Sequence, residues 1–359
     1  MIRKLWFQVG VGILLSILII RYFIEIKWIF GPLFIIAKTI FVPLLLGGVL
    51  YYVTEPIQRF LENRKFPRWA SILTICLGLI AGVWLFAATI VPPITDQVNK
   101  LAKNAPAIAQ EINNLKELLV EQKKGLPESF QGYIDSGTAS IESIAIGFGK
   151  WVVQFVQSFF QAIFLLVLVP FFFIFILKDH EKFAPFIAGF FEGKKKEWVR
   201  KTLHDMDTVL RTYVQGQFLI SFLLALLLLI GYSIIRLDYT LLLVIFALFM
   251  NLIPFIGPWI AFIPALLIAF IQDPTLVIWV SVITLAAQQT DSNLITPNVM
   301  GKTLDIHPLT VITIILAAGN IAGFLGIIIA IPVYAVGKAI TKNIYAARQE
   351  IRKTATKTV

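Results

Sequence analysis

Charged residues are scarce in this chain of 359 residues, since 14% are Asp, Glu, Lys or Arg while 58% are hydrophobic. Soluble domains carry about 25% charged residues, so the composition argues against a soluble protein. The few charges are also grouped, which leaves six long stretches without any, at 69–95, 151–177, 212–235, 239–272, 274–290 and 308–337. Because a helix needs about 20 apolar residues to cross a bilayer, these stretches predict an all-α polytopic membrane protein with the lipid bilayer as its surroundings.

Cysteine and histidine are nearly absent, with one Cys and three His in the whole chain. The single Cys76 can form no disulfide within the chain, so it indicates nothing about the redox compartment. The three histidines are far apart in sequence, and without a His-x-x-x-His or cysteine pair we expect no metal site. Phosphate-binding loops and the Gly-x-Ser-x-Gly elbow are missing as well. We therefore expect no enzyme activity and no cofactor.

The net charge of +10 would suit a nucleic-acid partner, but basic residues also collect on the cytoplasmic loops of membrane proteins. The second explanation fits better, so no nucleic-acid binding is expected. Basic residues dominate 58–68, 178–211 and 342–359, whereas 96–142 has seven acids and five lysines. This pattern predicts a multi-pass inner-membrane protein with both chain termini in the cytoplasm.

The chain is expected to contain about eight hydrophobic segments, beginning with a first span that is retained because no cleavage site follows it. The expected spans run over 5–24, 30–54, 69–93, 150–177 and 213–235. In order along the chain, the predicted regions are 1–93 (three spans), 94–147 (a polar extracytoplasmic helical excursion), 148–177 (the fourth span), 178–212 (a cytoplasmic amphipathic segment), 213–341 (a transport core) and 342–359 (a basic cytoplasmic tail).

The uncharged stretch 239–272 is unusual because it has 34 residues, which as one helix would be about 51 Å long. Pro254, Gly257 and Pro258 lie in its middle and should break the helix. The two limbs would each be roughly 22 Å long, which is short for a crossing of a hydrocarbon core about 30 Å thick. This arithmetic favours a re-entrant helical hairpin, although two full crossings satisfy the same charge rule.

A second stretch resembles the first, because NLIPFIGPWIAFIP from position 251 and NIAGFLGIIIAIP from position 320 share Asn, Phe, Gly and Ala at equal spacing. Chance similarity between membrane helices rich in Gly and Ala is one explanation. The other is a duplicated hairpin, with its break at Gly323 and Gly326. Two such hairpins entering from opposite faces would form an inverted repeat, which is a recurring design of transporters.

Polar side chains gather between the two predicted hairpins. Asp291 could bind a cation or carry a proton at membrane depth, or it could simply cap the next helix, with Ser292 and Asn293 as turn formers. Helix breaks also free backbone groups that bind ions and polar solutes. The substrate-binding candidates are Gln288, Gln289, Asn293, Asn251 and Asn320. For Asn251 and Asn320, a helix–helix hydrogen bond is the alternative role.

Several motifs, taken in order, are similar to those of the autoinducer-2 exporter family, a group of bacterial membrane proteins. They are FVPLLLGGVLYYVTEPIQRFL, VPPITDQV, FFFIFILKDHE, RTYVQGQ, NLIPFIGPWIAFIPALL, DSNLITPNVMGKTLDIHPLTVI and GNIAGFLGIIIAIPVYA. The resemblance covers essentially the whole chain and implies a secondary transporter that assembles as a homo-oligomer, for which a pentamer is our working assumption. Autoinducer-2 export, sodium/proton antiport and purine-related permease roles are attributed to members, so the resemblance leaves the solute open. The family pattern often has Glu-Gly-Asn where this chain has Asp291-Ser292-Asn293, which shortens the carboxylate's reach by one carbon.

We therefore expect a secondary transporter or exporter of a small polar solute, such as autoinducer-2, or of a monovalent cation. Transport would be coupled to a proton or sodium gradient, with Asp291 as the coupling carboxylate. The rival hypothesis is a membrane scaffold or assembly factor that acts through 94–147 and 178–212. The sequence determines neither the direction of transport nor the coupling ion.

Overall fold

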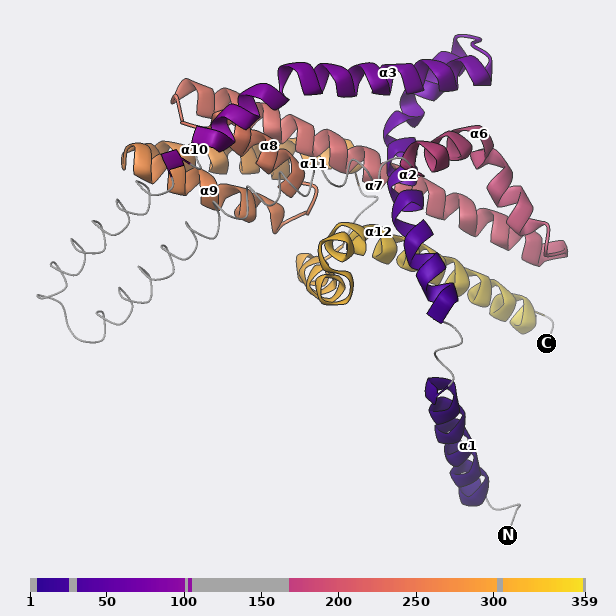
Figure 1. Ribbon diagram of the computed structural model, residues 1–359. Helices are drawn as coiled ribbons and strands as arrows, with labels where there is room; N and C mark the ends of the chain where they lie inside the picture. Colours follow the sequence, from indigo (N-terminus) through magenta and orange to yellow (C-terminus); the bar gives the residue numbers. More distant parts are fainter. Residues whose placement is uncertain (1–4, 26–30, 101–102, 105–167, 302–305, 358–359) are drawn as a thin grey trace, which may run out of the picture.

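A computed structural model of the chain describes residues 5–25, 31–100, 103–104, 168–301 and 306–357. Within these ranges every regular element is a helix, and no strand occurs (Figure 1). Four helices are long and apolar enough to cross a membrane, at Thr39–Asn63, Arg68–Lys100, Gly193–Ile234 and Leu325–Gln349. Shorter apolar helices accompany them. The expected all-α polytopic membrane fold is therefore confirmed.

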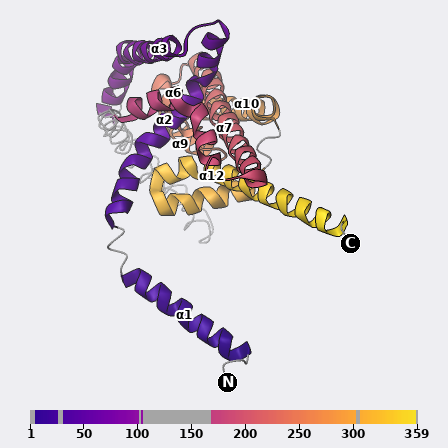
Figure 2. The same ribbon diagram turned by 90° about the vertical axis from the view of Figure 1, so that its right-hand side faces the viewer.

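The first three helices are α1 (Leu5–Glu25), α2 (Gly31–Asn63) and α3 (Arg68–Thr89). Figures 1 and 2 both show α1 standing apart from the other helices. The helix α2 continues well beyond the predicted span at 30–54, because its basic C-terminal part keeps a helical pattern until the turn at 64–67. After α3, helical residues extend to 100, where Gln97 Oε1 accepts a hydrogen bond of 2.9 Å from the Leu242 backbone N–H.

The helix α6 (Leu168–Ala188) packs closely against α2. Gly47 makes this approach possible, because a Cβ there would lie 3.0 Å from the backbone nitrogen of Phe173. Tyr51, Phe173 and Leu177 are buried at the junction together with Ile75 of α3. The predicted fourth span at 150–177 is described only from residue 168, and most of the predicted excursion at 94–147 lies outside the described residues.

The helix α7 (Gly193–Ile234) has 42 residues without interruption. The change from polar to apolar residues predicts an amphipathic segment ending at 212 and a span beginning at 213. The two form one helix because no proline occurs between 193 and 234, and the change from polar to apolar residues alters only what surrounds the helix. Close packing against later helices occurs at Gly216, next to Met300, and at Gly231, next to Ile283.

The last third of the chain consists of shorter elements around α7. They are α8 (Thr240–Met250), α9 (Gly257–Gln272), α10 (Leu276–Thr290), the π-helix η2 (Asp291–Ile295), α11 (Thr296–Met300) and α12 (Pro308–Lys357). The helices α8 and α9 pack against each other, and α7 packs against α8, α10, α11 and α12. This arrangement makes α7 the centre of the C-terminal part.

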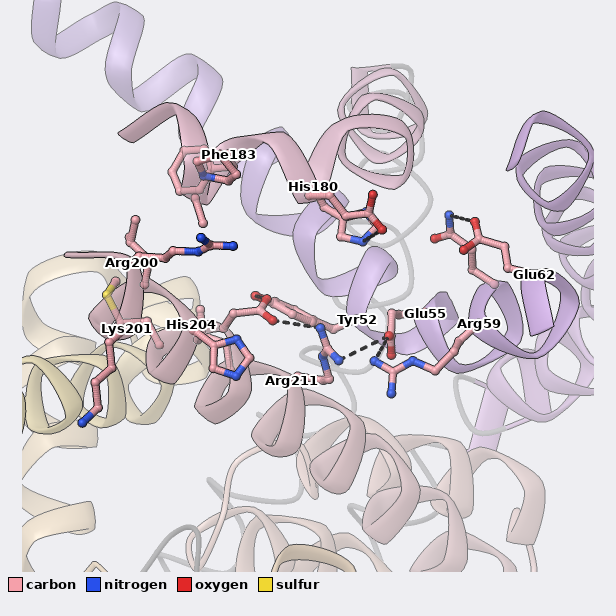
Figure 3. A pocket seen from close by; sticks show the side chains of 18 of the residues that line it. Tyr52, Glu55, Arg59, Glu62, His180, Phe183, Arg200, Lys201, His204 and Arg211 are labelled. Atoms are coloured by element: carbon pink, nitrogen blue, oxygen red, sulfur yellow. Dashed lines mark hydrogen bonds and ion pairs between the residues drawn. The ribbon is translucent and has the colours of Figure 1, made fainter. Parts of the chain in front are cut away.

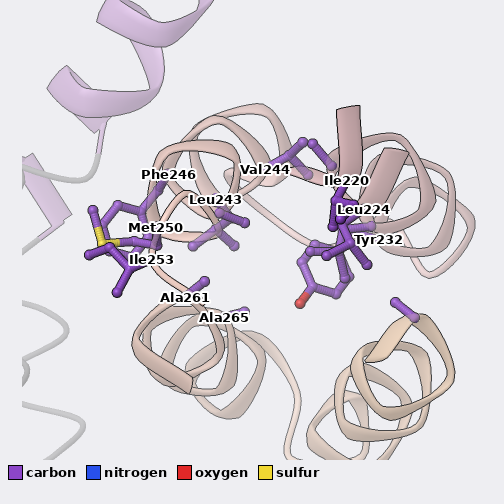
Figure 4. Packing of buried hydrophobic residues seen from close by; sticks show 14 of the residues in the cluster. Ile220, Leu224, Tyr232, Leu243, Val244, Phe246, Met250, Ile253, Ala261 and Ala265 are labelled. Carbon is purple, nitrogen blue, oxygen red and sulfur yellow. The ribbon is translucent and has the colours of Figure 1, made fainter. Parts of the chain in front are cut away.

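The main hydrophobic core lies between α7, α8 and α9 (Figure 4). Along α7, the buried side chains Ile220, Leu224, Leu228 and Tyr232 recur every four residues and therefore lie on one face of the helix. They meet the apolar side chains of α8 and the small residues of α9. Near the C-terminal end of α7, the Tyr232 and Thr284 hydroxyl groups share a hydrogen bond of 2.9 Å, which ties α7 to α10.

Both predicted interruptions are present, and each turns the chain back on itself. The first runs from Asn251 to Ile256, and the second is a kink at Ala322 and Gly323 within α12. The limbs of each hairpin approach most closely at a glycine. A Cβ on Gly257 would lie 1.9 Å from the Met250 carbonyl oxygen, and one on Gly326 would lie 2.1 Å from the Ala318 carbonyl oxygen. The two glycines that matched in sequence thus have the same role in both turns.

Candidate functional site

A cavity of about 600 Å³ lies where the α8–α9 turn meets α7 and the α10–η2–α11 segment. Ile306, Val311 and Ile331 close one side of it from the end of the chain. Polar side chains that line the cavity are Gln217, Asn251, Thr284, Gln288, Gln289, Asp291, Ser292 and Thr296. Tyr213, Phe255, Trp259 and Phe262 contribute aromatic rings. We call this the hairpin cavity.

Asn251 is the first residue after α8 and is only 3% exposed. Its backbone carbonyl oxygen accepts a hydrogen bond of 2.6 Å from Gln217 Nε2 of α7. Neither Oδ1 nor Nδ2 of its side chain has a hydrogen-bond partner within the part of the chain that the structure describes. A buried amide without hydrogen-bond partners destabilises the folded protein by about 1–3 kcal/mol. A ligand that formed hydrogen bonds with this side chain would remove that cost.

Asp291 begins the π-helix η2, in which hydrogen bonds join residues five positions apart. This spacing brings Thr296 back to Asp291, and the Thr296 hydroxyl donates a hydrogen bond of 2.7 Å to Asp291 Oδ1. Insertions of this kind into α-helices are frequent at functional sites. Among the described residues that line the hairpin cavity, Asp291 is the only one with a formal charge.

The predicted site residues fall into two groups. Asn251, Gln288, Gln289 and Asp291 all line the hairpin cavity, as do Pro254 and Pro258 of the first turn. Asn293 is not a lining residue, but its Nδ2 donates a hydrogen bond of 2.9 Å to Gln289 Oε1 and so orients that side chain. Asn320 lies apart from the cavity and donates to the Leu316 carbonyl oxygen within its own helix. Gly257, Gly323 and Gly326 shape the two turns.

Sequence reasoning missed Gln217, which is buried and reaches the first turn from a helix 34 residues earlier in the chain. A usable signal was present, because Gln215 and Gln217 are polar residues inside the uncharged stretch 212–235. Tyr213 and Thr284 were missed too. Each lies within an apolar helix in which nothing in the sequence indicates a functional polar side chain. Only the folded structure shows that they line the cavity.

A second, more charged cavity of about 880 Å³ lies between α2, α6 and α7 (Figure 3). At its inner end the Glu55 side chain is 9% exposed and lies between two arginines, 2.6 Å from Arg59 Nη2 and 3.4 Å from Arg211 Nη1. Arg211 also contacts Asp207 at 2.8 Å, and Asp207 accepts a hydrogen bond of 3.0 Å from the Tyr52 hydroxyl. This α2–α7 ion-pair network was not predicted, since it joins residues more than 150 positions apart.

Largely apolar helices that are long enough to cross a membrane, packed around two broken helical turns, define a polytopic α-helical membrane protein. The family model described as "AI-2E family transporter" matches residues 11–346. The chain therefore belongs to the AI-2E transporter family, as the motifs in its sequence suggested.

Individual relatives agree with this assignment. The chain is 33% identical over 340 residues to "Putative transport protein YueF" of Bacillus subtilis, which covers 92% of this chain and 91% of the relative. It is 26% identical over 349 residues to "Putative transport protein YrrI" of the same organism, covering 96% and 97% of the two chains. "Putative permease PerM" of Escherichia coli K12 is 27% identical over 319 residues, covering 87% and 89%.

Proposed function

We propose that this protein is a secondary transporter that binds a small polar solute or a monovalent cation in the hairpin cavity. The observation that carries the proposal is the combination of an unpartnered buried amide, Asn251, with the carboxylate of Asp291 in one cavity at a helix break. Membrane proteins tolerate broken backbone only where protein or a water-filled cavity covers it, and transporters use such breaks to hold solutes and ions.

In this proposal each lining residue has a distinct task. Asp291 is the coupling carboxylate, which exchanges a proton or sodium ion for the transported species. Asn251, Gln217 and Gln288 supply amide groups that replace water around the solute, and Gln289 does so in the orientation set by Asn293. Autoinducer-2 is one candidate solute, and the only support for it is the name of the family.

The proposal is tested by measuring flux into proteoliposomes with an imposed proton or sodium gradient. The probes are radiolabelled sodium and a panel of polar solutes that includes autoinducer-2. We expect Asp291→Asn to lower gradient-driven flux by about tenfold or more, because hydrogen bonds to a charged group are worth about 1.5–3 kcal/mol. Asp273→Asn is the matched control, since Asp273 lies in the exposed α9–α10 turn and does not line the cavity.

The same measurement separates transport from the scaffold alternative. A scaffold or assembly factor would give no saturable flux for any probe, in the wild type or in the variant. Equal flux in the wild type and in Asp291→Asn would instead retain transport but remove the coupling role from Asp291.

We also propose that the protein is a homo-oligomer in the bacterial inner membrane, with both termini cytoplasmic. The basic segments at 58–68, 178–211 and 342–359 support this orientation, because such residues favour the cytoplasmic side. Reporter fusions after residue 65 and at the C-terminus should both give a cytoplasmic signal, and native mass spectrometry should give a single multimeric mass, with a pentamer as the working assumption. A monomer, or a periplasmic signal at either position, would contradict this arrangement.

A further inference from the structure

The hairpin cavity combines one negative charge with no compensating positive charge among the described residues that line it. The only hydrogen bond to the Asp291 carboxylate comes, within the described part of the chain, from the neutral Thr296 hydroxyl. An ionised carboxylate without a cationic partner favours a cationic ligand over an anionic one. The charge of the cavity thus already restricts the class of solute.

Aromatic rings form much of the rest of the wall. Phe255 comes from the turn, Trp259 and Phe262 from the first part of α9, and Tyr213 from α7. The Trp259 and Phe262 rings lie with their centroids 6.5 Å apart at 74°, so ring faces and edges point in different directions within a short distance. Such rings offer a large apolar surface to the hydrophobic or aromatic part of a ligand.

The size of the cavity separates an organic ion from an inorganic one. Its volume of about 600 Å³ falls within the range of about 300–1,000 Å³ that is typical of sites for small organic molecules. A sodium ion needs only a compact shell of oxygen atoms, which the polar side chains around Asp291 can supply, and it would leave the apolar walls at Ile220, Leu224 and Phe262 without a contact.

We propose that the transported solute is an organic monocation, with an ammonium group beside Asp291 and an apolar body against the rings of Phe255, Trp259 and Phe262. This inference rests on the proposed transport function and narrows its substrate class. The amide groups of Asn251 and Gln288 provide oxygen acceptors for any N–H groups on the ammonium centre. The open side of the wall, where Trp259 is 67% exposed, receives the apolar body.

The test is equilibrium binding of radiolabelled benzyltrimethylammonium to the purified full-length protein in nanodiscs. Benzenesulfonate and benzyl alcohol serve as the anionic and neutral comparison ligands. We expect saturable binding of the cation only, weakened about tenfold or more by Asp291→Asn. Trp259→Ala should weaken binding by about 2- to 13-fold, the range of a contact between two aromatic rings, because it removes a ring from the benzyl group of the ligand, while Trp259→Phe retains most of the binding.

A matched control is Trp279→Ala, because Trp279 is similarly exposed at 57% but lies on α10 outside the cavity. This variant should bind the cation as the wild type does. Binding of benzenesulfonate or benzyl alcohol as tight as that of the cation would overturn the inference, as would cation binding that Asp291→Asn leaves unchanged. If the cation fails to bind while another solute shows Asp291-dependent flux, the organic-cation inference falls and the transport proposal stands. The absence of flux for every probe overturns the transport proposal itself.

Discussion

Replacing Gly257 by alanine is expected to destabilise the protein by about 3 kcal/mol or more, at the upper end of the cost of overpacking. The added Cβ would lie 1.9 Å from the Met250 carbonyl oxygen, which is backbone and cannot move aside without opening the first hairpin. The same argument applies to Gly326→Ala in the second hairpin, where the clash at 2.1 Å is with the Ala318 carbonyl oxygen. The loss of stability should appear as a lower midpoint of thermal unfolding, followed by size-exclusion chromatography of the detergent-solubilised protein.

Two other glycines make suitable controls for these variants. Gly48 of α2 and Gly337 of α12 have no heavy atom within 4 Å of an added Cβ. Alanine at either position should leave the midpoint unchanged or raise it slightly, because alanine stabilises a helix interior by about 0.5–1 kcal/mol relative to glycine. If Gly257→Ala unfolds at the same temperature as Gly48→Ala, the two limbs of the first hairpin do not approach each other as closely as described.

The second large effect is expected from Arg211→Met in the α2–α7 ion-pair network. Among the residues that the structure describes, the substitution leaves the buried Glu55 with Arg59 as its only charged partner and removes the ion pair of Asp207. Breaking a buried pair costs about 3–5 kcal/mol, and because Arg211 is partly exposed and Arg59 remains, we expect about 2 kcal/mol. The double variant Glu55→Gln/Arg211→Met should lose less stability than the two single variants added together, since it leaves no unpaired carboxylate at Glu55.

A double-mutant cycle in the thermal midpoint measures this coupling, which should reach about 1 kcal/mol for residues in direct contact. Lys182→Met provides the comparison, because Lys182 pairs with Asp179 on α6 with its side chain 77% exposed. Exposed pairs contribute about 0–1 kcal/mol, so this variant should change the midpoint little. Strictly additive effects of the Glu55 and Arg211 substitutions would show that the two side chains act independently.

Much of this architecture could be predicted from local sequence, because the bilayer imposes its constraints locally. An uncharged stretch too long for one span, with Pro254 and Gly257 at its centre, indicated a break that the structure has between Met250 and Gly257. The spacing shared with Gly326 likewise indicated the second turn. A bilayer restricts each helix separately, so single segments carried enough information.

The sequence could not predict which helices pack against one another. Asn251 and Asn320 occupy equivalent positions in the two similar stretches, yet only Asn251 lines the cavity. The difference arises from α7, whose Gln217 lies beside the first turn and not the second. The ion pair between Glu55 and Arg211 depends in the same way on helices far apart in the chain. Such contacts follow from packing, which neither charge patterns nor helix breakers encode.

The uninterrupted course of α7 has a mechanical consequence. Arg211 at the charged α2–α6–α7 cavity and Gln217 at the hairpin cavity are six residues apart on one continuous helix, or about 9 Å along its axis. A continuous helix moves largely as one unit. Tilting or sliding α7 so that Arg211 separates from Glu55 would therefore also shift the Gln217 side chain, which donates to the Asn251 carbonyl oxygen. We therefore expect high salt, which weakens the Arg211 ion pairs, to change the affinity of the hairpin cavity for its ligand. Ligand binding at the first turn should likewise change the strength of those ion pairs.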